Sequence, residues 1–96
     1  MKSSKIELSP QVADFLRTLA PHPRKQLRTA LRDLAMDKGD IIELEHPLDG
    51  FHRLRSGRYR IIFQYIIVNN DRVIRCEFAE ARKLVYEVFT DLIKGS

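Results

Sequence analysis

Apolar residues recur with two different periods along the chain. Between residues 10 and 38 they return every three or four positions, which is the spacing of one face of a helix. Pro21-His22-Pro23 interrupts this pattern, because a proline disfavours helical geometry in the residue before it. We therefore expect one helix after Ser9-Pro10 and a second from about Arg24 to a stop at Lys38-Gly39, joined as an antiparallel hairpin. The two apolar stripes are Val12, Phe15, Leu16, Leu19 and Leu27, Ala30, Leu31, Leu34.

The second half has the period of a β-strand. Residues 51–55 and 72–78 alternate between apolar and polar side chains, which predicts strands with one buried face. Residues 59–68 are largely apolar on both faces, as in a central strand that is covered on both sides. Ser56-Gly57 and residues 69–71 carry the turn-forming residues that separate these strands.

A short strand over residues 5–8 and a third helix over about residues 81–93 complete the predicted order. Alternation in the last strand is expected to place Ile74, Cys76 and Phe78 on the same side. The order strand, two helices, three strands, helix is typical of an α+β fold, with the helices packed on one face of a small, mostly antiparallel sheet. We expect the 96 residues to form a single domain.

Composition narrows the class of protein. The hydrophobic fraction of 44% is too high for a disordered chain. One cysteine, Cys76, cannot form an internal disulfide, which fits a reducing cytosol. The apolar stretch over residues 61–68 is shorter than the roughly 20 residues of a membrane helix, and the basic N-terminus lacks the apolar region of a secretion signal. His46, His52 and Cys76 do not have metal-ligand spacing. We therefore expect a cytoplasmic protein that uses no metal or other cofactor.

The net charge of +4 comes from one part of the chain. Residues 51–75 contain six arginines, no lysine and one acidic residue, so this segment carries +5 and the remainder −1. Arginine offers a planar, bidentate guanidinium that suits phosphate and stacks on bases, which points to a nucleic-acid partner. The six residues are Arg53, Arg55, Arg58, Arg60, Arg72 and Arg75.

Spacing adds a geometric argument. Arg53 and Arg55 are two apart in a predicted strand, so their side chains leave the same face about 7 Å apart, close to the spacing of phosphates along a single strand. Alternation points His52 away from that face. Phe51, Tyr59 and Tyr65 are aromatic residues that could stack on unpaired bases. A solvated sheet face with scattered salt bridges is the alternative that spacing leaves open.

Residues 47–63, PLDGFHRLRSGRYRIIF, resemble the signature of the RelE/ParE toxins of type II toxin–antitoxin systems. That signature reads roughly L-x-G-x-x-R-L-R-x-G-x-Y-R-[IV]-x-[YF]. The likeness extends over about residues 5–90, since the helical hairpin before the motif and Val85-Tyr86 after it come in the expected order. The matching positions are Leu48, Gly50, Arg53, Leu54, Arg55, Gly57, Tyr59, Arg60, Ile61 and Phe63.

The resemblance implies one of two activities. RelE-like members are metal-independent ribonucleases that cut messenger RNA on the translating ribosome and so inhibit translation, whereas ParE-like members poison DNA gyrase. Both are neutralised by an antitoxin encoded beside them, so an antitoxin partner is implied. We expect the ribonuclease, with a gyrase inhibitor and a non-toxic antitoxin-binding relative as alternatives. An apolar groove along the helical hairpin or a sheet edge is expected to accept an amphipathic antitoxin segment.

In the ribonuclease the 2′-OH of the RNA attacks the neighbouring phosphorus, so the protein must position the strand and stabilise added negative charge. The resemblance implies that Arg60 clamps the scissile phosphate while Arg53 and Arg55 hold the flanking backbone. Tyr86 would orient or deprotonate the 2′-OH, or else pack on the sheet as a structural residue. The candidate catalytic residues are therefore Arg53, Arg60 and Tyr86, and the candidate RNA-binding residues are Arg55, Arg58, Arg82 and Lys83.

Residues 80–86, EARKLVY, depart from the family pattern, because many family nucleases carry Gly-His-Arg shortly before the tyrosine. Ala81 occupies the histidine position, and Glu80 places a negative charge where phosphate is expected. Arg82 and Lys83 partly restore the positive charge. This departure weakens the expectation of a nuclease without removing it.

Overall fold

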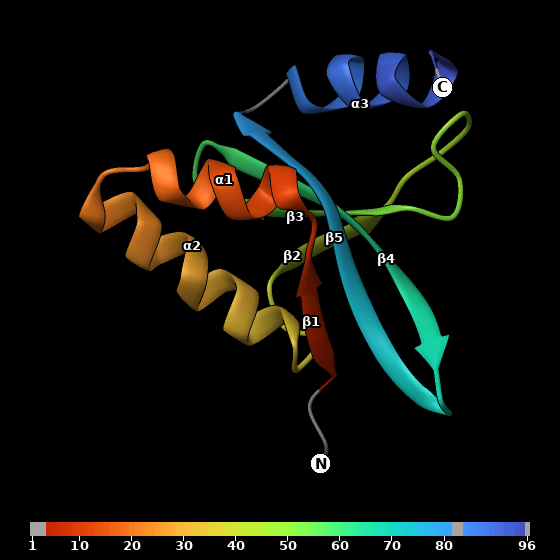
Figure 1. The fold of residues 1–96 in the computed structure, drawn as a ribbon, viewed down its shortest axis with the longest axis horizontal. Helices are drawn as coiled ribbons and strands as arrows, with labels where there is room; N and C mark the ends of the chain where they lie inside the picture. Colours follow the sequence, from red (N-terminus) through yellow and green to blue (C-terminus); the bar gives the residue numbers. More distant parts are fainter. Residues whose placement is uncertain (1–3, 82–83, 96) are drawn as a thin grey trace.

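The computed structural model describes residues 4–81 and 84–95, within which five strands form one mixed sheet and three helices pack against it (Figure 1). The predicted α+β class is confirmed. The elements are β1 (Lys5–Leu8), α1 (Pro10–Thr18), α2 (Pro21–Leu34), β2 (Asp40–Glu43), β3 (His52–Ser56), β4 (Tyr59–Val68), β5 (Asp71–Ala81) and α3 (Leu84–Lys94).

The strands lie in the order β1-β5-β4-β3-β2, which puts β4 at the centre of the sheet. β1 pairs with β5 in parallel, and the other neighbours are antiparallel, as the sequence predicts for most of the sheet. The central place of β4 explains its sequence, because Ile61, Ile62 and Phe63 are fully buried although successive side chains point to opposite faces.

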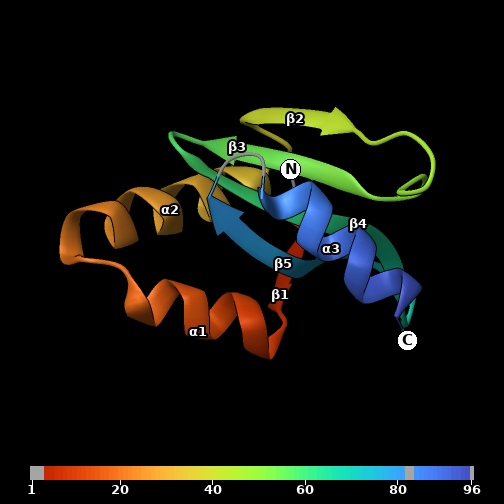
Figure 2. The same ribbon diagram turned by 90° about the horizontal axis from the view of Figure 1, so that it is seen from above.

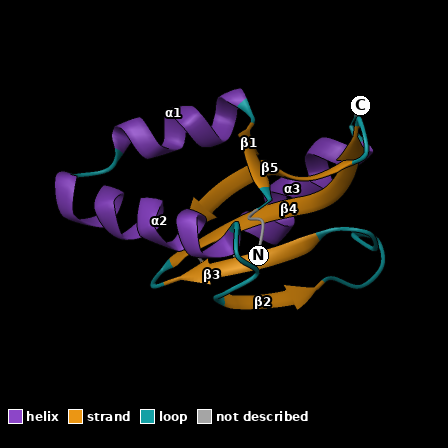
Figure 3. Ribbon diagram, turned by 90° about the horizontal axis from the view of Figure 1, so that it is seen from below, coloured by secondary structure: helices purple, strands orange, loops and turns teal. Residues whose placement is uncertain are grey.

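The two N-terminal helices form the expected hairpin (Figure 3). Ser9 caps α1, since its hydroxyl accepts a hydrogen bond from the Val12 amide at 3.2 Å. α2 begins at Pro21, not at about Arg24 as predicted. A proline is tolerated in the first turn of a helix, where its missing N–H has no intrahelical partner. The prolines therefore open the second helix as well as ending the first.

α2 ends at Leu34, before the predicted stop, and β2 follows, which the sequence pattern does not reveal. Between them Gly39 adopts a φ of 124°, and a Cβ there would lie 3.1 Å from the side chain of Leu54. β2 is an edge strand of four residues, and Ile42 in it is exposed. So short a segment contains too few alternations to be distinguished from a loop.

Each face of the sheet has its own apolar cluster. We call the face covered by α1 and α2 the hairpin face and the opposite one the α3 face. Side chains of β4 alternate between them: Ile61 and Phe63 point to the hairpin face and Ile62 to the α3 face. The prediction that the helices share one face is therefore wrong for α3, which lies away from the hairpin (Figure 2). The hairpin-face cluster is Val12, Leu16, Leu27, Leu31, Leu34, Leu54, Ile61, Phe63, Ile74, Cys76 and Ala79. The α3-face cluster is Leu48, Ile62, Phe78 and Phe89.

A β-bulge explains why Phe78 does not lie on the side of Cys76. Ile62 pairs with Phe78 but Phe63 pairs with Cys76, so Glu77 is an extra residue that reverses the alternation. The Ser9 hydroxyl donates to the carbonyl of Glu77 at 2.8 Å, which ties the start of α1 to the bulge. β5 continues to Ala81, so this residue ends a strand and does not begin the third helix as predicted.

Candidate nucleic-acid interface

β3 and β4 bring three of the predicted arginines onto the α3 face. Arg55 of β3 pairs directly with Arg60 of β4, and Arg53 pairs with Ile62, whose side chain belongs to the α3-face cluster. Residues directly opposite each other in antiparallel strands point to the same face. Arg53, Arg55 and Arg60 therefore share one side of the sheet, beside the turn that joins the two strands.

Two of these guanidinium groups share one carboxylate. Nη2 of Arg53 donates to Oδ1 of Asp40 at 2.8 Å, and Nε of Arg55 lies 2.9 Å from Oδ2 of the same residue. The Arg53 side chain is 12% exposed, while Arg55 and Asp40 are about half exposed, at 53% and 45%. Nε of Arg53 is buried without a hydrogen-bond partner among the described residues. Sequence reasoning missed Asp40, because its place beside the arginines depends on β2.

Arg60 is held by its own turn. Its Nη1 donates to the carbonyls of Gly57 and Tyr59, both at 3.1 Å, and its side chain is half-buried. Glu80 of β5 lies directly opposite Arg60 in the strand register, so the two side chains leave the same face of the sheet. The Glu80 carboxylate accepts a hydrogen bond from the Ala81 amide at 3.0 Å. The Asp40 carboxylate thus pairs with Arg53 and Arg55, and Glu80 shares the face of Arg60.

The remaining predicted RNA-binding residues are less well placed. Arg58 lies in the β3–β4 turn, opened by Gly57 with a φ of 60°, and its guanidinium carbon is 5.8 Å from the ring centre of Tyr59. Arg58 is exposed and precedes β4, so it is not part of the strand alternation that sets the direction of Arg60. Arg82 and Lys83 lie outside the described residues.

Tyr86 is brought to the same face by α3. Its half-buried side chain packs against the α3-face cluster, which includes Ile62 next to the arginines. Phe89, one turn further along α3, anchors the helix through edge contacts with Phe51 at a ring separation of 5.1 Å. The structure therefore places Tyr86 on the side of Arg53, Arg55 and Arg60, in a packed position.

The other arginines of residues 51–75 belong to separate surfaces. Nη2 of Arg72 contacts both carboxylate oxygens of Asp37 at 2.6 Å, and the guanidinium carbon of Arg72 lies over the Tyr65 ring, 4.6 Å from its centre. Burial raises the pKa of the Tyr65 hydroxyl, and the Asp37 carboxylate adds to this while Arg72 opposes it. Arg75 pairs with Glu7 of β1 at 3.3 Å. The six arginines do not form one surface.

His52 points away from Arg53 and Arg55, as predicted. Its ring stacks on Phe63 of the hairpin-face cluster at 5.4 Å and meets Tyr65 edge-on at 5.0 Å. Its Nε2 lies 3.9 Å from the Glu43 carboxylate. Among residues 4–81 and 84–95, no three His, Cys, Asp or Glu residues are grouped closely enough to hold a metal ion. None of the described helices has the length and apolar character that a membrane span requires.

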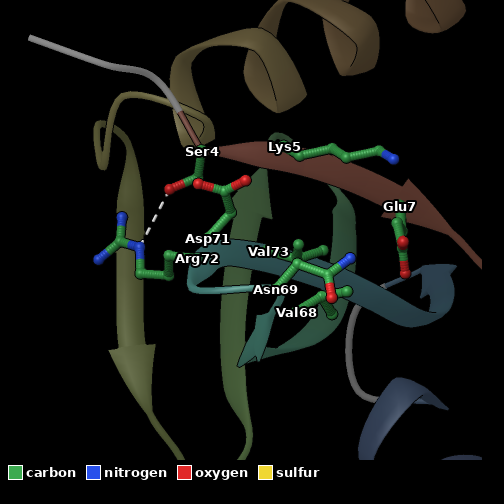
Figure 4. A pocket seen from close by; sticks show the side chains of 8 residues that line it. All are labelled: Ser4, Lys5, Glu7, Val68, Asn69, Asp71, Arg72 and Val73. Atoms are coloured by element: carbon green, nitrogen blue, oxygen red, sulfur yellow. Dashed lines mark hydrogen bonds between the residues drawn. The ribbon is translucent and has the colours of Figure 1, made fainter.

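Two hollows lie away from the arginine cluster formed by Arg53, Arg55 and Arg60. One, of about 460 Å³, lies between the start of β1 and the β4–β5 turn, where Nε of Arg72 donates to Ser4 Oγ at 3.0 Å (Figure 4). The other, of about 540 Å³, lies between β1, α1 and α2 and matches the predicted groove along the hairpin. Its lining combines apolar and basic side chains: Ile6, Leu8, Ala13, Leu16, Leu31 and Ala35 with Arg17, Arg28 and Arg32.

Solved structures of known proteins share this fold. The RelBE2 toxin–antitoxin complex of Mycobacterium tuberculosis matches with a TM-score of 0.68 and 18% identity, covering 83% of this chain and 99% of that one. The RelE–RelB complex of Pyrococcus horikoshii matches with a TM-score of 0.64 and 25% identity, covering 84% and 97%. The isolated Escherichia coli RelE toxin matches with a TM-score of 0.64 and 14% identity, covering 96% and 97%.

Models of protein families and curated protein sequences yield no match to the chain. The similar structures are RelE-type toxins, which agrees with the resemblance noted in the sequence. The order of strands and helices and the arginine-rich segment of β3 and β4 are the features of the chain that match. The chain therefore has the fold of the RelE toxins, and residues 47–63 resemble the RelE/ParE signature.

Proposed function

We propose that the protein is the toxin of a type II toxin–antitoxin pair and that it cuts messenger RNA on the translating ribosome. The observation that carries the proposal is the shared face of Arg53, Arg55 and Arg60, with Tyr86 of α3 on the same side. Toxin–antitoxin complexes among the similar structures support the toxin role and an antitoxin partner.

The proposed cleavage requires that the RNA strand be held in position and that the negative charge developing on its phosphate be stabilised. The 2′-OH attacks the neighbouring phosphorus, the bond to the 5′ oxygen breaks, and a cyclic phosphate is left on the upstream fragment. Arg60 would stabilise the charge that accumulates on the phosphate oxygens, because its side chain is already held in place by two backbone carbonyls. Arg53, nearly buried, and Arg55, half exposed, would hold the flanking backbone. Tyr86 would orient the 2′-OH.

The antitoxin is proposed to occupy the groove between β1, α1 and α2. An apolar floor suits the apolar face of an amphipathic helix, and the Arg17, Arg28 and Arg32 rim suits acidic residues beside that face. Charge reversal by Arg28→Glu should weaken neutralisation by a co-expressed antitoxin, measured as loss of growth rescue. Lys25→Glu, on the same helix but outside the groove lining, is the matched control and should leave rescue intact.

Induced expression with separate pulse-labelling of protein and DNA tests the activity. The wild-type chain should stop protein labelling while DNA labelling continues, and cellular messages should acquire new 5′ ends. Arg60→Ala should abolish both effects. Arg75→Ala, which removes an arginine paired with Glu7 outside the cluster, should behave like wild type. Intact messages under wild-type expression would contradict the ribonuclease proposal.

The carboxylates of Asp40 and Glu80 favour the alternatives, because they reduce the positive charge that an RNA backbone would meet. A gyrase inhibitor would depress DNA labelling first and leave messages uncut. A non-toxic antitoxin-binding relative would leave growth and both labels unchanged. The same induction experiment therefore separates the three functions.

A further inference from the structure

Asp40 occupies a position between two candidate phosphate-binding arginines. Its two oxygens lie 2.8 Å from Nη2 of Arg53 and 2.9 Å from Nε of Arg55, so each oxygen meets a different guanidinium. A phosphate group of RNA presents pairs of oxygens to arginine in a similar way. The carboxylate thus makes the contacts that a backbone phosphate would make at the same place.

The strand that carries Asp40 is a short strand at one edge of the sheet. β2 has four residues, pairs on one side only, and follows Gly39, whose φ of 124° marks an irregular backbone. Asp40 itself is 45% exposed, so its ion pairs are partly screened by water. Arg53, in contrast, is 12% exposed and lies on β3, which is paired on both sides. Arg53 is thus enclosed within the sheet, whereas the Asp40 carboxylate lies at a solvent-accessible edge.

We propose that Asp40 is an internal competitor for RNA phosphate, holding Arg53 and Arg55 in their binding geometry until a phosphate group displaces it. This inference rests on the proposed function, since it takes RNA as the ligand of these arginines. It assigns a regulatory role to a carboxylate of β2: Asp40 keeps Arg53 from being a buried unpaired charge in the free protein and sets a threshold for binding. The threshold favours a polyanion over single phosphate ions, because several contacts are needed to offset the loss of the Asp40 pairs.

The test measures the affinity of the full chain for a short single-stranded RNA with 2′-O-methyl groups, which cannot be cut by 2′-OH attack. Asp40→Asn removes the charge but keeps a carbonyl oxygen for Arg53. Glu43→Gln is the matched control, because it makes the same charge change on the same strand while Glu43 faces His52 on the other side of the sheet. Fluorescence anisotropy gives the three dissociation constants, and thermal unfolding checks the fold of each variant.

We expect Asp40→Asn to bind the RNA about threefold to tenfold more tightly than Glu43→Gln, the fold-change that corresponds to about 1 kcal/mol for a half-exposed ion pair. Equal affinities would mean that only the overall charge matters, and would overturn the proposal. Weaker binding by Asp40→Asn would overturn it too, since Asp40 would then be a structural support for Arg53 alone.

A second measurement uses the unaltered chain and decides the question even if Asp40→Asn does not fold. The side-chain Nε–H resonance of Arg55 is followed by NMR as the same RNA is added. It should shift to saturation, because Asp40 gives way to phosphate. The corresponding signal of Arg75, whose Nε contacts Glu7 at 3.3 Å, should stay in place. An Arg55 signal that does not move while RNA binds would overturn the proposal.

The two proposals fail separately. Tighter RNA binding by Asp40→Asn together with uncut ribosomal message from the wild-type chain would support the inference and contradict the nuclease. Cut message together with no gain in binding would do the reverse. Neither readout depends on the other, because the 2′-O-methyl RNA reports binding without cleavage.

Discussion

The two faces of the sheet are built differently. The hairpin face carries eleven of the buried apolar residues that the structure describes, whereas the α3 face carries four. Arg53, Arg55 and Arg60 all lie on the α3 face. Because burial of apolar area supplies most of the stability of a fold, we infer that the hairpin face holds the sheet together. The α3 face is then free to carry charge at little cost to folding.

The largest effect is expected from the hairpin face. Leu34 is fully buried, so Leu34→Ala should lower the free energy of unfolding by about 2–5 kcal/mol through lost burial and the cavity left behind. Urea denaturation followed by circular dichroism measures the loss. Ile67→Ala, at a side chain that is 69% exposed, is the control and should change the midpoint little. A small loss of stability in Leu34→Ala would contradict the inference that the hairpin face holds the sheet together.

A pH series tests how tightly the hairpin face is buried, through the thiol of Cys76. Burial raises the pKa of the Cys76 thiol to about 12 from its ordinary value of 9.0. Between these two values the unfolded chain loses the proton and the folded chain keeps it, so stability should fall as pH rises, by about 1.4 kcal/mol per pH unit from this group. At pH 8 and below the thiol should have almost no effect. Urea midpoints at pH 8 to 11 measure the slope, which should be shallower in Cys76→Ala.

The α3 face should tolerate loss of its anchor. Phe89→Ala should lower the free energy of global unfolding by about 1 kcal/mol, less than a core phenylalanine usually costs, because α3 can separate while the hairpin-face cluster stays intact. Hydrogen exchange should show faster exchange in α3 and unchanged protection in β4. A loss as large as that of Leu34→Ala, with faster exchange throughout, would mean that the two faces unfold as one unit.

The smallest effects should come from the arginines. Arg72→Ala removes two contacts to Asp37 and the stacking on Tyr65, so it should cost about 0.5–1 kcal/mol. Arg55→Ala on the α3 face should cost less than about 0.5 kcal/mol, because Asp40 keeps its bond from Arg53. Thermal unfolding at matched salt measures both. A larger loss at Arg55 would assign that residue a structural role.

The elements with a strong period could be predicted from the sequence, and those set by distant pairing could not. The stripes of α1 and α2 and the two apolar faces of β4 are local patterns, so they indicate the hairpin and the central strand directly. The bulge at Glu77 depends on how β5 pairs with β4, and the side on which α3 lies depends on what remains uncovered. Neither leaves a periodic signal.

The same limit applies to the candidate site. Alternation predicts that Arg53 and Arg55 share a face, and the turn at Gly57 brings Arg60 opposite Arg55. Asp40 is 13 residues from Arg53 along the chain and belongs to a strand too short to recognise, so its ion pairs could not be anticipated. The sequence therefore predicts the positive charges of the site and Glu80, but not the Asp40 carboxylate that pairs with two of the arginines.

The first strand of the chain has the last strand as its partner. Lys5 pairs with Val73 and Leu8 with Cys76, so β1 has no place in the sheet until residue 76 has left the ribosome. β4 and β5 are adjacent in sequence and joined by two residues, Asn69 and Asn70, whose φ values of 50° and 67° suit a tight hairpin. During synthesis this β-hairpin can form before β1 docks, and β1 then joins the sheet together with the start of α1. β1 is thus synthesised before β4 and β5 but joins the sheet after they have paired.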